Sequence, residues 1–339
     1  MSRAQLTSTV EQSNGGVVAP FLAGNNKIIN GDFGIWQRGA SFSNPSSLAY
    51  TADRWAIYYD GSGATRTISQ QAFTTGAAPV SGYESSFFYR YAVSVAGSGN
   101  TANLLRQYIE NVRNFAGQTA TVSFWAKASA NITVPSVGTT QNFGTGGSPS
   151  AGVDTGFATN IAVTTSWQRF SFTANIPSIS GKTLGTNNDT SLELRFFLPA
   201  GSSTFTFDIW GVQVEAGSVA TPFTTASGTL QGELALCQRY YQSRSVMYKS
   251  TSSGGFSTNA YDSGIFPTQM RATPTLVFTS DTGTSGAANL YVSGSATAST
   301  AISITAAVDG FRGNFSNASW GTTANGAFLA YSYTANAEL

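Results

Sequence analysis

The side chains that usually carry enzyme chemistry are scarce in this chain of 339 residues. It contains no histidine, and Cys237 is its single cysteine. Without histidine the chain lacks the commonest general base, the usual activator of serine and cysteine nucleophiles, and the commonest metal ligand. A carboxylate pair such as Glu193 with Asp208 is the remaining route to catalysis, by glycoside cleavage. Neither lies in a catalytic motif, and pairing with arginine or capping a turn also explains them. The sequence therefore predicts a protein that is not an enzyme.

One set of aromatic and charged side chains fits sugar binding. A sugar site needs flat aromatic rings against the apolar faces of the sugar, with amides or charges for its hydroxyls. Trp125 and Lys127 share one face of a predicted strand, and Glu193 and Arg195 point outward from another. If the two strands are neighbours, these four residues form a glycan-binding face. A subunit interface or ordinary packing is the alternative, because interfaces are also enriched in aromatic residues and arginine.

The elements that would position these residues are β-strands. Apolar and polar residues alternate with period two, the pattern of a strand with one buried face, in residues 120–127, 167–174, 192–198 and 205–214. The alternation changes phase near Trp210, which predicts a β-bulge beside Gly211. The predicted fold class is all-β: an antiparallel jelly-roll sandwich, one linking helix, and a second, smaller C-terminal β domain.

The chain divides into four predicted parts. These are an N-terminal attachment arm (1–24), a jelly roll (25–225), a linking helix (226–244) and a C-terminal β domain (245–339). The arm is polar and without amphipathic period, so a disordered tail is the alternative. A helix of about three turns is predicted over 229–243, from the helical spacing of Leu230, Leu234, Cys237 and Tyr241. Cys237 is predicted to be buried there, as free cysteines usually are.

Composition narrows the class of protein further. Charged residues make up 10% of the chain and the net charge is +1, against about 25% charged in an average soluble domain. No basic stripe can follow a phosphate backbone, which excludes nucleic acid, and no apolar run of about 20 residues indicates membrane insertion. The Ser-, Thr-, Asn- and Gly-rich surface is typical of extracellular and virion β proteins and suits oligomers. With no signal peptide recognisable at the first residues, release by cell lysis, as from a virus particle, is predicted.

Several motifs, taken in order, resemble those of bacteriophage structural proteins. Asn30–Phe33, Ile35–Gly39 and Ala52–Trp55 resemble the opening of the carbohydrate-binding-module-like jelly roll found in phage tail proteins. The later strands of that jelly roll, and the segment that follows its last strand, have similar counterparts here in residues 122–128, 167–173, 207–218 and 220–223. Glu233–Tyr241 is similar to a segment common in phage fibre proteins, and residues 266–274 to the start of their C-terminal domains. The resemblance covers most of residues 26–280.

The resemblance implies one metal site. Jelly rolls of this type often hold a structural calcium between the first and last strands, which places Asp32 and Asp208 near it. Calcium takes about six to eight oxygen ligands, and acidic residues are few here. The alternative is that Asp208 caps a bulge or pairs with Arg38 or Arg54. No other cofactor is predicted.

The function implied by the resemblance is that of a virion structural protein. A tail fibre or receptor-binding adhesin that recognises host surface glycan fits it first, docked on other virion proteins through residues 1–24 and assembled as a homotrimer, as such fibres commonly are. The alternative is a capsid decoration protein, a cement or head fibre that stabilises the shell. Either role places the chain on the exterior of the virion, on the tail or the capsid. An exported bacterial lectin is a third hypothesis.

Overall fold

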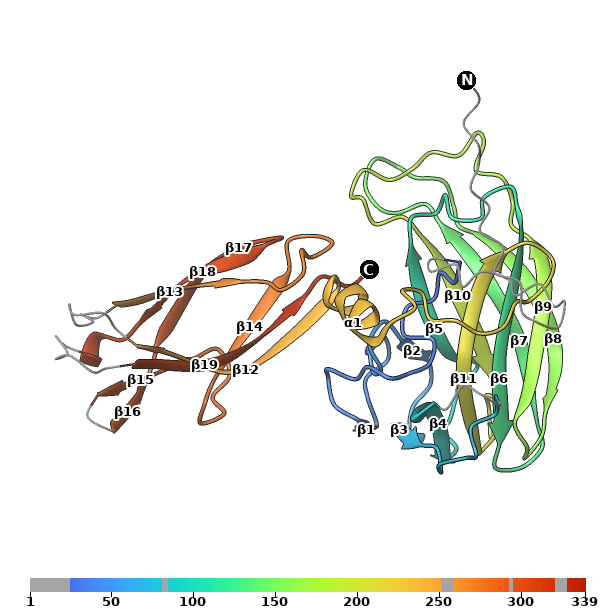
Figure 1. The fold of residues 1–339 in the computed structure, drawn as a ribbon, viewed down its shortest axis with the longest axis horizontal. Coiled ribbons are helices and arrows are strands. Elements are labelled where there is room, and N and C mark those ends of the chain that lie inside the picture. Colours follow the sequence, from blue (N-terminus) through green and yellow to red (C-terminus); the bar gives the residue numbers. More distant parts are fainter. Residues whose placement is uncertain (1–24, 81–84, 251–258, 293–294, 321–327) are drawn as a thin grey trace, which may run out of the picture.

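Two β units lie side by side and are joined by helix α1 (Leu230–Gln238), as Figure 1 shows. The computed structural model describes residues 25–80, 85–250, 259–292, 295–320 and 328–339. The predicted attachment arm, residues 1–24, lies outside the described residues. All strand pairings of both units are antiparallel, so the all-β fold class with one linking helix is confirmed.

The larger unit is a sandwich of two sheets. The six-stranded sheet has the order β1 (Ser41–Ser43), β3 (Thr65–Ala72), β4 (Phe87–Val95), β11 (Phe205–Ala216), β6 (Thr119–Ala128) and β9 (Gln168–Asn175). The five-stranded sheet has the order β2 (Ala56–Tyr59), β5 (Asn103–Glu110), β10 (Ser191–Leu198), β7 (Ile132–Asn142) and β8 (Val153–Val163). Most successive strands alternate between the two sheets, the connectivity of a jelly roll.

The core lies between these sheets and is built by the alternation seen in the sequence. Val122 and Phe124 of β6 point inward and are buried against Leu194 and Phe196 of β10 and their neighbours. The predicted bulge is confirmed, because the register of β11 with β6 shifts between Trp210 and Gln213. The bulge lets both Ile209 and Val212 point into the core although they are three residues apart, while Trp210 is buried on the opposite face of the sheet.

Gly211 sits in this bulge with φ +64°, a conformation that glycine adopts without steric cost. A Cβ atom at this position would lie 2.8 Å from Cε3 of Trp125. We expect Gly211→Ala to lower the free energy of unfolding by about 1–3 kcal/mol, from positive φ and overpacking together, as measured by urea denaturation. Gly156→Ala is the matched control, because its Cβ would meet no described atom within 4 Å. Equal losses in the two variants would contradict this account of Gly211.

The smaller unit has its own core between two further sheets. One contains β12 (Tyr241–Ser250), β19 (Phe328–Asn336), β15 (Asn289–Val292) and β16 (Ser295–Ala298), with β14 (Thr275–Ser280) also paired to β19. The other has the order β13 (Asn259–Ile265), β18 (Gly310–Ser316) and β17 (Ala301–Ala307). A short 3-10 turn, Ala318–Trp320, follows β18. Phe278, Phe315 and Tyr331 pack between the sheets, so the second β unit is confirmed.

Helix α1 is shorter than the predicted 229–243. It begins after Thr229, whose hydroxyl accepts a hydrogen bond from the Gly232 amide (3.1 Å), and ends at Gln238. Tyr241 already pairs with Asn336 in β12–β19, a partner that local periodicity cannot reveal. Within the described part of the chain, no helix has the length and apolar character to cross a membrane.

Only the later part of the predicted apolar stripe of this helix is buried. Leu230 and Leu234 are 65% and 36% exposed, whereas Cys237 is buried as predicted and Glu233 is buried with it. The Glu233 carboxylate accepts hydrogen bonds from the amides of Asn30 (2.8 Å) and Ser227 (2.6 Å). The helix therefore docks on the sandwich through a polar group, which a search for apolar spacing does not find.

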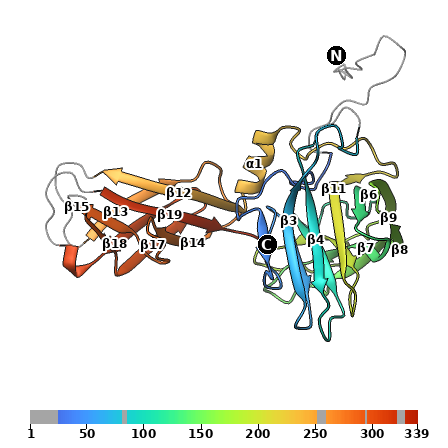
Figure 2. The same ribbon diagram turned by 90° about the horizontal axis from the view of Figure 1, so that it is seen from below.

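A buried ionic cluster fastens the two units together. Glu338, just after β19, pairs with Arg54 and with Arg38 (3.1 Å), both on the sandwich. The Arg54 and Arg38 guanidinium groups lie over the rings of Tyr240 and Tyr241, 3.4 and 3.5 Å from the ring centroids. Figure 2 shows the end of the chain in this position, between the two units.

Candidate functional site

The outer sheet face is the side of the five-stranded sheet that points away from the core. In β10, Leu192, Leu194, Phe196 and Leu198 are buried in the core, so the alternate residues point outward. The strand register places Glu193 opposite Tyr108, Arg195 opposite Arg106, and Phe197 opposite Leu104. With the neighbouring strands, the outer sheet face comprises Tyr58, Leu104, Arg106, Tyr108, Ser136, Gly138, Thr140, Asp154, Glu193, Arg195 and Phe197.

Two ion pairs order the polar groups of this face. Arg106 Nη1 lies 3.1 Å from Glu193 Oε1, and Arg195 Nη2 lies 2.7 Å from Asp154 Oδ1. The Thr140 hydroxyl donates a further hydrogen bond to Asp154 (2.7 Å). Asp154 is 71% exposed, whereas the Arg106, Glu193 and Arg195 side chains are largely covered. The charges are therefore held in place by one another, with hydrogen-bonding capacity directed along the sheet.

Three aromatic rings are interleaved with these charges. Arg106 lies between the rings of Tyr58 and Tyr108, with Cζ 5.6 and 5.2 Å from their centroids, and Arg195 lies 5.2 Å from the Phe197 ring. All three rings are half-buried, so each keeps a surface toward solvent. Burial, followed by the nearby Glu193 carboxylate, raises the pKa of Tyr108. Its hydroxyl therefore stays protonated at neutral pH and can both donate and accept a hydrogen bond.

The four residues predicted to bind glycan are divided between two sheets. Glu193 and Arg195 lie on the outer sheet face, but Trp125 and Lys127 lie in β6, on the outer side of the six-stranded sheet. The condition that their two strands be neighbours is not met, because β6 pairs with β11 and β9, and β10 pairs with β5 and β7. In a two-layer sandwich, the outer sides of the sheets point in opposite directions.

Trp125 is also covered, which removes it as a stacking surface. It is 8% exposed and packs in a second aromatic cluster with Phe88, Trp210 and Phe223. This cluster forms because Phe223, from the segment after β11, packs on the outer side of the six-stranded sheet together with Phe73 and Val80, from the segment after β3. Alternation identified the outward side of β6 but could not show what covers it.

Further residues complete the outer sheet face, and the sequence pattern alone does not bring them together. Phe197 continues the outward series of Glu193 and Arg195, and that alternation was the signal for it. Arg106 and Tyr108 alternate with buried Leu105 and Ile109 in β5, so the same pattern was present there. Only the strand order, which brings β2, β5, β10 and β8 into one sheet, shows that these side chains share a face.

The carboxylates considered for catalysis and calcium have other partners. Glu193 and Asp208 belong to different sheets, so they do not flank a common bond. Asp208 binds Arg90 through both carboxylate oxygens (2.7 and 2.8 Å), not Arg38 or Arg54 as the alternative proposed. Asp32 instead lies near Glu233, and burial followed by that carboxylate raises the pKa of Asp32 to about 6. In the described ranges no group of three or more Asp, Glu or Cys side chains is arranged to hold a metal. Calcium stays a prediction that these contacts do not favour.

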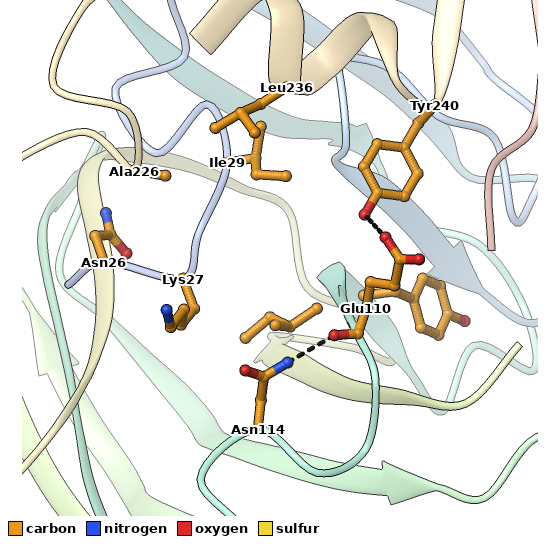
Figure 3. A pocket seen from close by; sticks show the side chains of 10 residues that line it. Asn26, Lys27, Ile29, Glu110, Asn114, Ala226, Leu236 and Tyr240 are labelled. Carbon is orange, nitrogen blue, oxygen red and sulfur yellow. Dashed lines mark hydrogen bonds between the residues drawn. The ribbon is translucent and has the colours of Figure 1, made fainter. Parts of the chain in front are cut away.

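A hollow of about 250 Å³ lies elsewhere, where helix α1 meets the end of β5 (Figure 3). Glu110 accepts a hydrogen bond from the Tyr240 hydroxyl (2.7 Å) and forms an ion pair with Arg239 (3.0 Å). Burial opposes ionisation of Glu110, but the hydrogen bonds from Arg239 and Tyr240, together with the charges of Arg239 and Arg271, outweigh burial and lower the pKa of Glu110. Asn114 donates to the Glu110 carbonyl oxygen (2.6 Å). The polar groups here hold the helix against the sandwich, so the outer sheet face is the better candidate for ligand binding.

Comparison with known proteins finds likeness only among solved structures. No family model and no curated protein matches the chain. A family 4 carbohydrate-binding module is 18% identical with a TM-score of 0.33 and covers 56% of this chain and 98% of its own. A xylan-binding domain of Xyn10C from Paenibacillus barcinonensis is 10% identical with a TM-score of 0.32, covering 53% and 94%. A putative sugar-binding protein from Bacteroides thetaiotaomicron is 11% identical with a TM-score of 0.34, covering 57% and 100%. These values are too low to transfer what those proteins bind.

Proposed function

We propose that the chain is a non-catalytic glycan-binding protein and that the outer sheet face is its binding surface. The observation that carries the proposal is the interleaving of half-buried rings with fixed charges. Tyr58 and Phe197 present ring surface for the apolar faces of sugars, while Arg106 and Glu193, joined in an ion pair, supply donors and acceptors for hydroxyls. Because the pair is ordered before a ligand arrives, little side-chain entropy is lost on binding.

Tyr58→Ala tests this surface. We expect the variant to bind a neutral polysaccharide up to about tenfold more weakly, because a stacking ring contributes about 0.5–1.5 kcal/mol. Affinity electrophoresis and calorimetry against xylan, β-1,3-1,4-glucan and bacterial envelope polysaccharides would measure the loss. Tyr261→Ala is the matched control, since this tyrosine is 72% exposed on the smaller unit. Equal affinity of the two variants, or no binding of any polysaccharide by the unchanged protein, would reject the proposal.

We further propose that glycan binding serves attachment of a virion to its host, as a homotrimeric tail fibre. The order of the motifs along the chain between Asn30 and Pro274 and the low content of charged residues support this role. Imaging of intact particles labelled with antibody against residues 245–339 tests it, together with the mass of the purified protein relative to the 35.4 kDa chain. Label on the tail fibres and a trimeric mass are expected. Label over the head would instead make the chain a capsid decoration protein.

A further inference from the structure

The outer side of the six-stranded sheet carries a second group of charges beside aromatic rings. Arg90 of β4, Asp208 of β11 and Lys127 of β6 lie side by side, because Asp208 is paired in register with each of the other two. This side faces away from the outer sheet face across the whole thickness of the sandwich. A ligand bound here is therefore independent of one bound on the five-stranded sheet.

The charges in this group do not cancel. Arg90 engages both oxygens of Asp208 through Nε (2.7 Å) and Nη2 (2.8 Å), while Lys127 Nζ is 3.9 Å from the same carboxylate. Two cations thus share one buried carboxylate, which leaves an excess positive charge. The Lys127 and Arg90 side chains are 28% and 34% exposed, so both cations reach solvent. A bidentate guanidinium is the stronger partner, so the Lys127 ammonium is the less neutralised group.

Aromatic rings form a wall beside Lys127. Its Nζ lies 5.2 Å from the ring centroid of Trp167 and 5.5 Å from that of Phe88. Trp167 is half-buried and is held by ring contacts with Phe73 (5.4 Å) and Phe88 (5.3 Å). The indole therefore presents a fixed surface with the Lys127 ammonium over its ring, whereas Trp125 is covered.

We propose that this group is a second binding site, selective for an acidic sugar such as a hexuronic acid. The sugar carboxylate binds Lys127 and Nη1 of Arg90, the guanidinium nitrogen that contacts Gln71 Oε1 (3.4 Å) and not Asp208, and the sugar ring lies against Trp167. An anion supplies the negative charge that Asp208 alone does not, and a charge-assisted contact of this kind is stronger than a neutral one. The proposal does not depend on the outer sheet face, which offers matched ion pairs and no excess of cations.

Calorimetry with a galacturonate oligosaccharide, and with the same oligosaccharide after reduction of its carboxyl groups to alcohols, tests the site. We expect binding of the acidic form that weakens as salt is added. Lys127→Met keeps the aliphatic stem against the rings and should weaken this binding about tenfold, the size of one charge-assisted contact. Lys127→Arg should restore most of the affinity, and Trp167→Ala should weaken it as Lys127→Met does. Neutral polysaccharide binding should be the same in Lys127→Met as in the unchanged protein.

Three results would overturn the proposal: no binding of the galacturonate oligosaccharide, equal binding of its reduced form, or unchanged affinity in Lys127→Met. Tyr58→Ala separates the two surfaces. If Tyr58→Ala still binds the galacturonate oligosaccharide, the result supports a site on the six-stranded sheet. If Tyr58→Ala no longer binds it, the acidic sugar binds to the outer sheet face, and the site at Lys127 is rejected. If neutral polysaccharides fail to bind, the proposed function falls, while the Lys127 result is still decided by the acidic ligand.

Discussion

Replacing Glu338 with glutamine should lower the free energy of unfolding by about 3–5 kcal/mol, the range for removing one partner of a buried ion pair. Arg54 is 1% exposed, and its guanidinium depends on the Glu338 carboxylate for neutralisation. Burial alone would lower the pKa of Arg54, but Glu338, with smaller contributions from Tyr240 and Tyr50, more than offsets it and the pKa rises. Glutamine keeps the shape of the side chain but leaves the buried guanidinium, and Arg38 beside it, without that charge. Urea denaturation followed by tryptophan fluorescence measures the loss.

The exposed ion pair on the outer sheet face provides the control for this result. Asp154→Asn makes the same chemical change, but Asp154 is 71% exposed, so a loss of at most about 1 kcal/mol is expected. The double variant Arg54→Met with Glu338→Leu should be more stable than Glu338→Gln alone, because it leaves no buried charge unpaired. Equal losses in Glu338→Gln and Asp154→Asn would show that solvent reaches the ionic cluster and that it does not fasten the units.

The larger unit could be anticipated from the sequence because its strands keep one face in a core. Alternation is a local property, and it correctly assigned the inward residues of β6 and β10, including Val122 and Leu194. The bulge could also be predicted from the sequence. The apolar alternation changes phase at Trp210, and apolar residues on both sides of this point can face the same core only if the strand has an extra residue. These features follow from side chains within a few residues of one another.

What escaped prediction depends on contacts between distant segments. Neither Trp125 nor Arg195 carries information about which strand lies next to its own, so the sequence left open whether they share a face, and their strands belong to different sheets. Helix α1 ends early because Tyr241 pairs with Asn336, and its buried face is set by Glu233, which caps amides in two loops. Polar groups that satisfy distant backbone atoms leave no periodic trace in a sequence.

Asp53 should contribute to the stability of the protein in mild acid, and this contribution should be lost toward neutral pH. Burial, the largest influence, raises the pKa of Asp53 from 3.8 to about 6, although the hydrogen bonds from Gln37 (2.6 and 3.2 Å) and the Arg38 cation oppose it. The folded state then binds the proton more tightly than the unfolded chain. The contribution of Asp53 to the free energy of unfolding is therefore fully present below about pH 4 and is lost as the pH rises through about 6. A shift of about two pKa units corresponds to about 3 kcal/mol.

Comparison with Asp53→Asn isolates this contribution, because asparagine does not titrate. The unfolding free energy of the unchanged protein minus that of the variant should fall by up to about 3 kcal/mol between about pH 4 and about pH 6.5, and then level off. Urea denaturation at a series of pH values gives the difference directly. If the difference rises with pH instead, the Arg38 cation and the two Gln37 hydrogen bonds outweigh burial and hold Asp53 ionised. Asp53 would then stay ionised with Glu338 even in mild acid, and the acid sensitivity of the junction would have the opposite sign.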